Sequence, residues 1–199
     1  TMCGIVGYTG PHQALPFVLA GLGRLEYRGY DSAGVAVLDG DGDLHTAKKA
    51  GALVNLERHI DAGEVALAGT VGIGHTRWAT HGAPTDRNAH PHLDCRNKVA
   101  VVHNGIIENF EELVVGLDAR GHERRSDTDT EVVAHLVEER YAGDLAATVR
   151  SICKDLQGSF VLVVAHQDEP ELVVAARRNL PLVVGLGEGE NFLGSDVTA

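Results

Sequence analysis

The sequence lacks a long hydrophobic run, an excess of basic charge and a paired cysteine pattern. Its longest purely apolar run covers residues 160–165, whereas a membrane-spanning helix needs about 20 apolar residues. No basic segment followed by an apolar one opens the chain. We therefore expect no secretory signal and no membrane association, and we predict a cytoplasmic location.

The three cysteines, Cys3, Cys95 and Cys153, are odd in number and contain no closely spaced pair. This usage is typical of a reducing compartment rather than of a disulfide framework. The 17 basic and 28 acidic residues give a net charge of −11. Because non-specific affinity for nucleic acids comes mainly from neutralised phosphates, this balance argues against a nucleic-acid partner.

The composition that remains is that of one globular domain. Hydrophobic residues make up 44% of the chain and charged residues 23%, and no repeat or low-complexity linker is visible. Apolar spacing predicts strands at 3–8, 33–38, 44–48, 71–75, 99–103, 160–165, 172–176, 182–186 and 191–194. It predicts helices at 11–25, 53–60, 110–117, 130–141 and 145–156, and a long polar loop at 76–97. Helices grouped between two blocks of strands favour an α+β fold over an alternating βαβ one.

Cys3 is the most informative single residue. It follows Met2 directly and begins a predicted strand. If Met2 were removed, Cys3 would carry a free α-amine with a pKa of about 8, which can accept a proton from a neighbouring nucleophile. The alternative is a small apolar cysteine packed in a strand.

Three further segments offer polar groups that suit acyl chemistry. Asn104 and Gly105 can present a side-chain N–H and a backbone N–H to an oxyanion, although such a pair is more often a turn. Arg77 offers a planar fork for a carboxylate, or forms a surface salt bridge. Asp129 can bind an ammonium group, or cap the helix that follows it.

Five motifs occur in order along the chain. They are Met-Cys-Gly-Ile-Val-Gly at 2–7, Arg-Leu-Glu-Tyr-Arg-Gly-Tyr-Asp-Ser-Ala-Gly at 24–34, Gly-His-Thr-Arg-Trp-Ala-Thr-His-Gly at 74–82, Val-His-Asn-Gly-Ile-Ile-Glu-Asn at 102–109 and Ser-Asp-Thr-Asp-Thr-Glu-Val at 126–132. Together they closely resemble the glutaminase domain of the glucosamine-6-phosphate synthase family (glutamine–fructose-6-phosphate aminotransferases, isomerising). These enzymes are class II glutamine amidotransferases with the N-terminal nucleophile hydrolase fold. The resemblance implies a four-layer αββα sandwich of two antiparallel sheets over residues 1–199.

The resemblance also implies hydrolysis of L-glutamine to glutamate and ammonia, with no metal or organic cofactor. The resemblance implies that Cys3 is the nucleophile and that Asn104 and Gly105 donate to the oxyanion. Arg77 would bind the α-carboxylate of glutamine, and Asp129 its α-ammonium. The further implied roles are pocket lining for Thr80 and His81, control of ammonia passage for Trp78, and support of the nucleophile for Arg28.

Two departures from the family pattern concern the ends of the sequence. Thr1 and Met2 precede Cys3, and Thr1 is interpreted as a residue left by expression cloning. If both residues persist, the nitrogen of Cys3 is an amide and we expect little or no activity. The family continues beyond the position of Ala199 into domains that bind fructose 6-phosphate, and its full-length members are expected to be homo-oligomers.

Three alternatives remain at this point. The chain could be a glutamine-binding module without catalysis, or the amidotransferase domain of a sibling family. A zinc hydrolase built on His90, His92, Asp94 and Cys95 is the third, although the spacing matches no standard zinc motif.

Overall fold

The computed structural model describes residues 3–28, 30–63, 65–78 and 82–199. Among the residues singled out above, Thr1, Met2, Thr80 and His81 lie outside these ranges. The backbone of Arg28 lies in a short 3₁₀ turn, but its side chain is not among the described parts of the structure.

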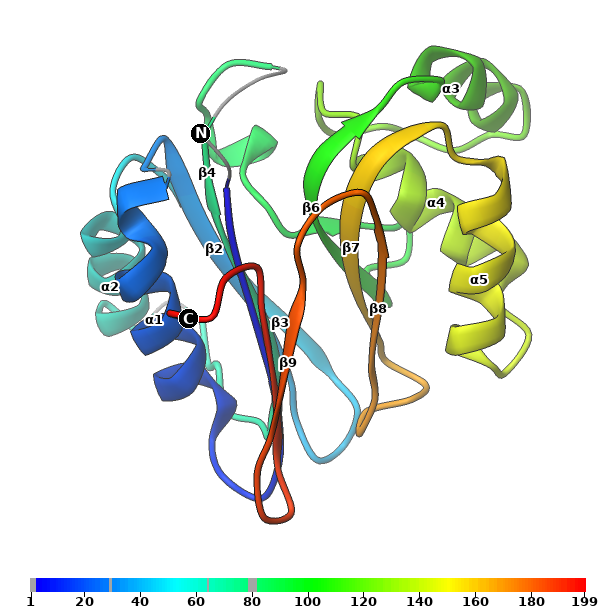
Figure 1. Ribbon diagram of the computed structural model, residues 1–199. Helices are drawn as coiled ribbons and strands as arrows, with labels where there is room; N and C mark the ends of the chain where they lie inside the picture. The colour runs from blue at the N-terminus through cyan, green and yellow to red at the C-terminus, as the bar shows by residue number, and fades with distance from the viewer. Residues whose placement is uncertain (1–2, 29, 64, 79–81) are drawn as a thin grey trace.

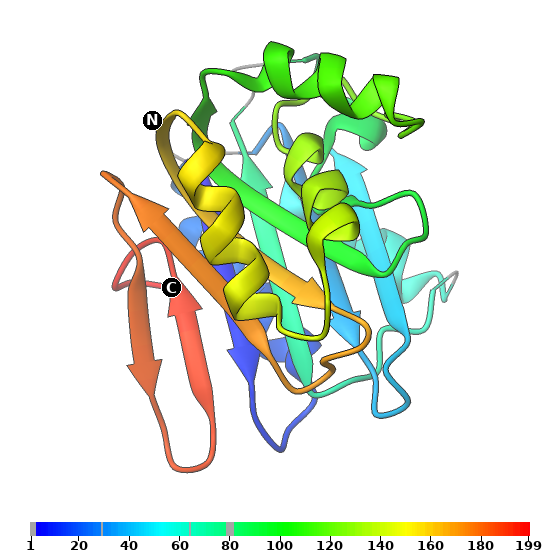
Figure 2. The same ribbon diagram turned by 90° about the vertical axis from the view of Figure 1, so that its right-hand side faces the viewer.

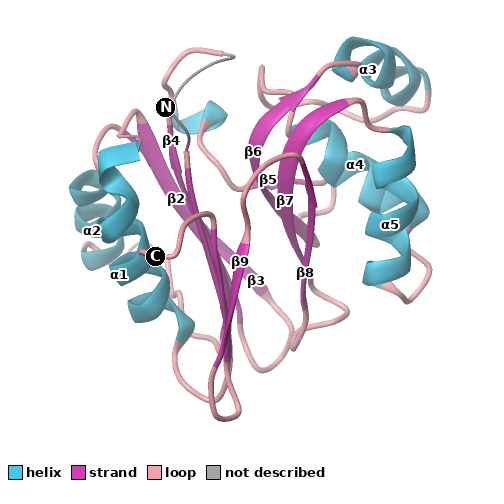
Figure 3. Ribbon diagram, in the orientation of Figure 1, coloured by secondary structure: helices cyan, strands magenta, loops and turns pink. Residues whose placement is uncertain are grey.

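Two antiparallel sheets stack face to face, and helices cover both outer sides (Figures 1 and 3). The first sheet has the strand order β3-β2-β4-β1-β10-β9, and the second has the order β5-β6-β7-β8. The strands of the first sheet are β1 (Gly4–Thr9), β2 (Ser32–Leu38), β3 (Leu44–Ala50), β4 (Val71–Arg77), β9 (Val183–Leu186) and β10 (Asn191–Gly194). Those of the second sheet are β5 (His92–Leu93), β6 (Val99–Ile107), β7 (Gly158–His166) and β8 (Val173–Arg178).

The helices form the two outer layers. They are α1 (Ala14–Leu25), α2 (Leu53–Asp61), α3 (Phe110–Ala119), α4 (Glu131–Arg140) and α5 (Leu145–Asp155), with 3₁₀ turns η1 (Glu26–Arg28) and η2 (Asp86–Asn88). Helices α1 and α2 pack on the first sheet, whereas α4 and α5 pack on the second (Figure 2). The predicted four-layer α+β arrangement is confirmed. Within the described ranges, every helix falls short of the length and apolar character that a membrane crossing requires.

Three apolar layers separate these four layers of structure. The central layer lies between the sheets and includes Ile5, Ile73, Val102 and Val163, all buried. The outer layers lie between each sheet and its own helices. Because β1, β2 and β7 are covered on both faces, their sequences are nearly continuous apolar runs rather than alternating ones.

Several strands are longer than the sequence predicted, and two of the extensions carry candidate site residues. Strand β4 continues to Arg77, and β6 continues through Asn104 and Gly105 to Ile107. The strand predicted to end at residue 103 is therefore too short, and the alternative of a turn at Asn104-Gly105 is wrong. Gly105 has a φ of +117°, and a Cβ there would lie 2.0 Å from the carbonyl oxygen of Ser159 on β7. Here the glycine allows a close approach between paired strands rather than a change of chain direction.

Strand pairing brings the ends of β1, β4 and β6 to one edge of the sandwich. Gly4 at the start of β1 pairs with Thr76 near the end of β4. Asn104 of β6 bonds to the backbone of Cys3, which precedes β1. Polar residues far apart in the sequence therefore meet at this edge, in the upper part of Figure 1.

Gly34 packs closely against residues 89–91, which lie within the predicted polar loop. A Cβ at Gly34 would lie 2.0 Å from the carbonyl oxygen of His90, and the Lys48 ammonium holds the same segment by donating to the carbonyls of Ala89 (2.9 Å) and Pro91 (3.2 Å). Gly34→Ala should lower the free energy of unfolding by about 1–3 kcal/mol, because a backbone oxygen must move. Gly40→Ala is the matched control, since nothing lies within 4 Å of that position. Urea unfolding should leave the control within about 0.5 kcal/mol of the parent, and equal effects of the two substitutions would contradict the assignment.

Candidate active site

A polar pocket lies at the edge where β1, β4 and β6 meet. It has about 300 Å³ of empty space. Its lining residues are Cys3, His75, Arg77, Trp78, His90, His103, Gly105, Thr128, Asp129 and Thr130. The pocket thus combines a thiol, a guanidinium, a carboxylate and several imidazoles from both sheets and from the segment before α4.

Cys3 is held by the residue that follows β4. Its Sγ accepts a hydrogen bond from the Trp78 N–H at 3.1 Å and lies 3.6 Å from the Trp78 carbonyl oxygen. Burial raises the pKa of the Cys3 thiol, and the Trp78 N–H and the Arg77 charge offset only part of that rise. At neutral pH the sulfur is therefore mainly a thiol, which is a weak nucleophile unless a base removes its proton.

Asn104 lies beside Cys3 and is fixed from two sides. Its Nδ2 donates to the Cys3 carbonyl oxygen at 2.8 Å, and its Oδ1 accepts from His75 Nε2 at 3.0 Å. The same His75 nitrogen lies 2.9 Å from the His103 carbonyl oxygen. Because two oxygens face Nε2, that nitrogen carries the proton. Burial lowers the pKa of His75 to about 3, so the ring is neutral.

His75 is one of four pocket residues that the sequence analysis missed, with His103, Thr128 and Thr130. It lies inside the motif at 74–82 and was not assigned a role there. The sequence does indicate that His75 faces the pocket, because it lies two residues before Arg77 and therefore on the same face of a strand. Its effect is to fix which side of the Asn104 amide presents N–H groups.

Arg77 and Asp129 bring opposite charges to the pocket. Burial lowers the pKa of Arg77, while Cys3 and Asp129 act in the opposite direction. The guanidinium also donates to the carbonyls of Ala83 (3.4 Å) and Gly82 (3.3 Å). A neighbouring cation and anion in one pocket are complementary to the carboxylate and ammonium of an amino acid.

Asp129 does not cap the helix that follows it. Its Oδ2 accepts from the backbone N–H of Ile107 on β6 at 2.9 Å, and its Oδ1 lies 3.8 Å from His103 Nδ1. Thr130, the N-cap residue of α4, makes no side-chain capping bond either. The Glu131 carboxylate accepts from the backbone N–H groups of Arg125 and Ser126, each at 2.7 Å, and so holds the segment that precedes the helix. Asp129 thus belongs to the pocket wall.

Trp78 stands at the rim, with 37% of its surface exposed, and its ring packs edge-on against Tyr30 at a centroid distance of 5.5 Å. Residues Thr80 and His81 and the Arg28 side chain lie outside the description, so their predicted roles stay predictions.

Four buried histidines cluster here, and three of them, His75, His90 and His103, line the pocket. The His75 and His90 rings stack at 4.2 Å, and His92 packs edge-on against His90 at 4.6 Å. His90 and His103 each lie within 2.9 Å of the Thr130 hydroxyl. Burial lowers the pKa of all four rings, so they are neutral at physiological pH.

The residues of the alternative zinc site, His90, His92, Asp94 and Cys95, form hydrogen bonds with separate partners. His90 bonds Thr130 and His92 bonds the Thr128 hydroxyl. The Asp94 carboxylate accepts backbone N–H groups at 2.7 and 2.9 Å in its own loop. The structure does not bring these side chains together with Cys95 as one ligand set.

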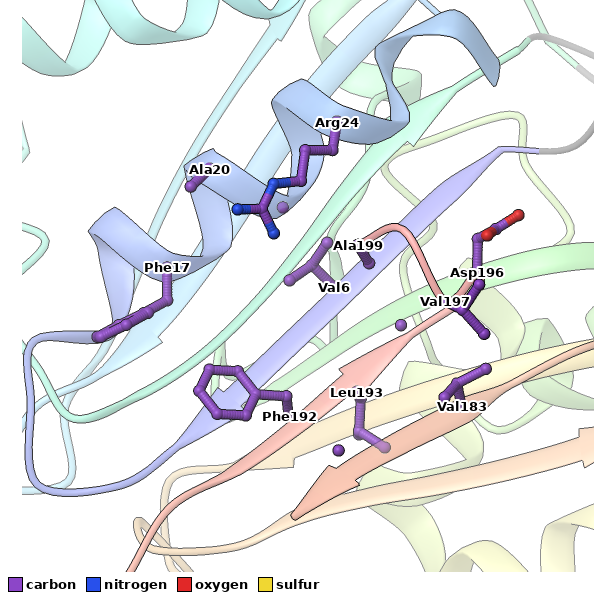
Figure 4. A pocket seen from close by; sticks show the side chains of 13 residues that line it. Val6, Phe17, Ala20, Arg24, Val183, Phe192, Leu193, Asp196, Val197 and Ala199 are labelled. Carbon is purple, nitrogen blue, oxygen red and sulfur yellow. The ribbon is translucent and has the colours of Figure 1, made fainter. Parts of the chain in front are cut away.

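A larger pocket lies between α1 and the C-terminal segment (Figure 4), with about 730 Å³ of empty space. Phe17, Phe192 and Val197 contribute apolar surface, while Arg24 and Asp196 contribute charges. Its lining contains no thiol, hydroxyl or imidazole. The chemistry of the groups, rather than the size of the space, therefore selects the smaller pocket as the candidate active site.

Comparisons with known proteins relate the chain to glutamine-using enzymes. A family model described as a glutamine amidotransferase domain matches residues 75–199. A glutamine–fructose-6-phosphate aminotransferase (isomerizing) of Streptomyces coelicolor is 64% identical over 200 residues, which is 100% of this chain and 32% of that protein. Its namesake in Thermus thermophilus is 58% identical over 198 residues, with the same coverage. The chain thus spans about a third of the length of these relatives.

A solved structure shares the whole architecture. The glutamine phosphoribosylpyrophosphate amidotransferase of B. subtilis superimposes with a TM-score of 0.82 at 26% identity, over 97% of this chain and 42% of that chain. This similarity identifies the four-layer sandwich as the N-terminal nucleophile hydrolase fold, as the motifs implied.

The buried histidines predict a steep loss of stability in mild acid. Each ring has a lowered pKa in the folded state, whereas its unfolded pKa is about 6.5. Below pH 6.5 the unfolded chain therefore binds protons that the folded chain does not. Stability is full above that pH and falls toward the folded pKa, by up to about 1.4 kcal/mol per pH unit for each ring.

Urea unfolding between pH 7.5 and 5 measures this slope. His90→Gln should reduce it by up to about 1.4 kcal/mol per pH unit, because one proton is no longer taken up on unfolding. His12→Gln is the control, since His12 is exposed. A stability that does not change between pH 7.5 and 5 would show that the rings are not kept neutral.

Proposed function

The chain belongs to the family of class II glutamine amidotransferase domains, and on that premise we propose that it hydrolyses the side-chain amide of L-glutamine with Cys3 as the nucleophile. The products are glutamate and ammonia. The observation that carries the proposal is the convergence of the Cys3 sulfur, the Asn104 amide, Arg77 and Asp129 at one edge of the sandwich.

The two charged residues orient the substrate. The Arg77 guanidinium binds the α-carboxylate of glutamine, and the Asp129 carboxylate binds its α-ammonium. The side chain of glutamine then extends toward Cys3 at the start of β1. Trp78, whose backbone N–H holds the Cys3 sulfur, controls access at the rim of the pocket.

The reaction proceeds through a thioester. The Cys3 sulfur attacks the amide carbon, and the resulting oxyanion accepts hydrogen bonds from Asn104 Nδ2 and the Gly105 N–H. When the carbon–nitrogen bond breaks, the nitrogen takes up a proton and leaves as ammonia. Water then attacks the thioester, releasing glutamate and the thiol. His75 acts as a positioning residue, since its N–H keeps the Asn104 oxygen turned away from the oxyanion.

The base is the α-amine of Cys3. Because burial raises the pKa of the Cys3 thiol, attack requires a group that takes its proton. A chain-terminal amine with a pKa of about 8 can do so near neutral pH. When Thr1 and Met2 remain attached, this nitrogen is an amide and is not basic. We therefore infer that the active form begins at Cys3 and that the form with both residues retained is inactive.

The ammonia serves a longer protein. The aminotransferases of Streptomyces coelicolor and Thermus thermophilus carry fructose 6-phosphate in their names, and this chain matches about a third of each. We propose that it supplies ammonia for the amination of fructose 6-phosphate, which a further part of a cytoplasmic, homo-oligomeric enzyme binds.

The first experiment tests the base. A chain beginning at Cys3, confirmed by intact mass, should release glutamate from glutamine. The chain that retains Thr1 and Met2 should be at least about a hundredfold slower, since general-base assistance is worth about 10²–10⁴ in rate. Cys3→Ala in the shorter chain should abolish turnover. Equal turnover by the long and short chains would contradict the role of the amine.

The second experiment tests substrate orientation. Asp129→Asn should raise KM for glutamine by roughly 10–100-fold, because a charge-assisted hydrogen bond worth about 1.5–3 kcal/mol is lost while an oxygen remains for the Ile107 N–H. Asp127→Asn is the matched control, since Asp127 lies two residues away and pairs with Arg87 outside the pocket. The same KM for both variants would contradict the assignment.

A further inference from the structure

Four potential metal ligands converge on the outer face of the second sheet, away from the active-site pocket. They are Cys95, His122, His135 and Glu138, here named the Cys95 cluster. One donor atom of each lies within 4.8 Å of the others. Cys95 follows β5, His122 follows α3, and His135 and Glu138 are one turn apart on α4. The proposed glutaminase reaction uses none of them.

Four of the six distances between donor atoms match those of a tetrahedral site, and the other two pairs lie within 4.8 Å. Cys95 Sγ lies 3.5 Å from His122 Nδ1 and 3.5 Å from His135 Nδ1. Glu138 Oε2 lies 3.2 Å from His122 Nδ1 and 3.6 Å from His135 Nδ1. Metal bonds of about 2.0–2.1 Å to nitrogen and 2.3 Å to sulfur, arranged tetrahedrally, separate neighbouring donors by roughly 3.4–3.6 Å. A central ion therefore fits with little movement of the side chains.

His122 directs its second ring nitrogen at a carboxylate, since its Nε2 lies 3.1 Å from Glu139 Oε1. The His135 Nε2 lies 3.6 Å from Glu131 Oε1, which is longer than a hydrogen bond, and it has no hydrogen-bond partner among the described residues. A carboxylate behind a zinc-bound histidine fixes the tautomer and raises the basicity of the ligand nitrogen. With Nε2 protonated, the Nδ1 lone pair of each ring points into the cluster.

The interior of the cluster has an excess of acceptors. With both Nε2 atoms protonated, two Nδ1 lone pairs and Glu138 Oε2 face one another. The Cys95 backbone N–H donates to Glu138 Oε2 at 3.2 Å, and Arg96 lies 3.4 Å from Glu138 Oε1, so among the described groups the two Nδ1 lone pairs have only the Cys95 thiol proton to share. His135 and Glu138 are largely buried, with exposed side-chain fractions of 1% and 10%, so water does little to relieve this. A divalent cation would satisfy all four donors, and a thiolate plus a carboxylate would balance its charge.

We propose that Cys95, His122, His135 and Glu138 bind one divalent metal ion, with zinc as the best match, in a closed structural site. Thiolate and imidazole ligands favour zinc over magnesium or calcium. Four protein ligands leave no open position, which is the arrangement of structural rather than catalytic zinc. The ion ties the segments that carry Cys95 and His122 to α4, and binding releases the thiol proton.

Zinc chloride alone, added to the chelator-treated 199-residue chain, is the probe. We expect one zinc per chain by elemental analysis after dialysis. A hundredfold excess of zinc over its Kd should raise Tm by roughly 5–10 °C. Cobalt(II) should give the d–d bands of a tetrahedral ion and a thiolate-to-cobalt charge-transfer band. These readouts do not depend on glutaminase activity, so failure of either proposal is recognised separately.

Variants assign the ligands. Cys95→Ser and His122→Gln should each weaken zinc binding by more than about a hundredfold, because loss of an outer partner alone costs about 10–100-fold. Glu139→Gln should weaken it by about tenfold. Cys153→Ser is the matched control, since Cys153 is a free cysteine on α5 outside the cluster. It should bind zinc like the parent.

Substoichiometric zinc in the parent chain, or a cobalt spectrum without the thiolate band, would overturn the proposal, and neither result depends on whether a variant folds. Zinc affinity that is unchanged in folded Cys95→Ser protein would overturn it as well.

Discussion

The face-to-face packing of the two sheets is the constraint on which the active site depends. Side chains alternate along a strand, so a residue two positions from an inter-sheet residue faces the same way. Candidate site residues continue the faces that form the central apolar layer. Cys3 lies two positions before Ile5, His75 and Arg77 lie two and four positions after Ile73, and Asn104 lies two positions after Val102. A register slip of one residue would turn Ile73, and the inter-sheet residues of the other strands, to the opposite face of the sheet. The candidate site residues on the same face would be separated at the same time. Stability of the core and assembly of the site are thus one requirement.

That coupling explains how much the sequence could predict. Strand faces are local patterns, and Cys3, Arg77 and Asn104 lie in recognisable motifs at strand ends, so their convergence could be anticipated. The role of His75 could not, because its importance lies in one hydrogen bond to a residue 29 positions away. The alternative of a turn at Asn104 was wrong for a similar reason, since pairing of β6 with β7 overrode the local preference of an Asn-Gly pair.

Cys95 shows the limit of spacing arguments most clearly. The sequence placed it next to His90 and His92, which are close along the chain but face Thr130 and Thr128. Its actual neighbours, His122 and His135, lie 27 and 40 positions away. Only the packing of α4 beside β5 brings them together. A cluster with no regular spacing carries no sequence signature, however well its donor atoms match a tetrahedron.

Glu131 links the two sites. Although burial opposes it, interactions with His135 and Ser126 and the Arg125 N–H hold the pKa of this carboxyl down to about 2, so it is ionised. One oxygen thus faces a member of the Cys95 cluster, while the pair of oxygens fixes the start of the segment that leads to Asp129. An ion in the cluster would restrict the motion of α4. Because the Glu131 carboxylate holds the segment that leads to Asp129, the motion of the pocket wall would be restricted as well. The candidate pocket would then be braced from two directions, by the core between the sheets and by the helix behind it.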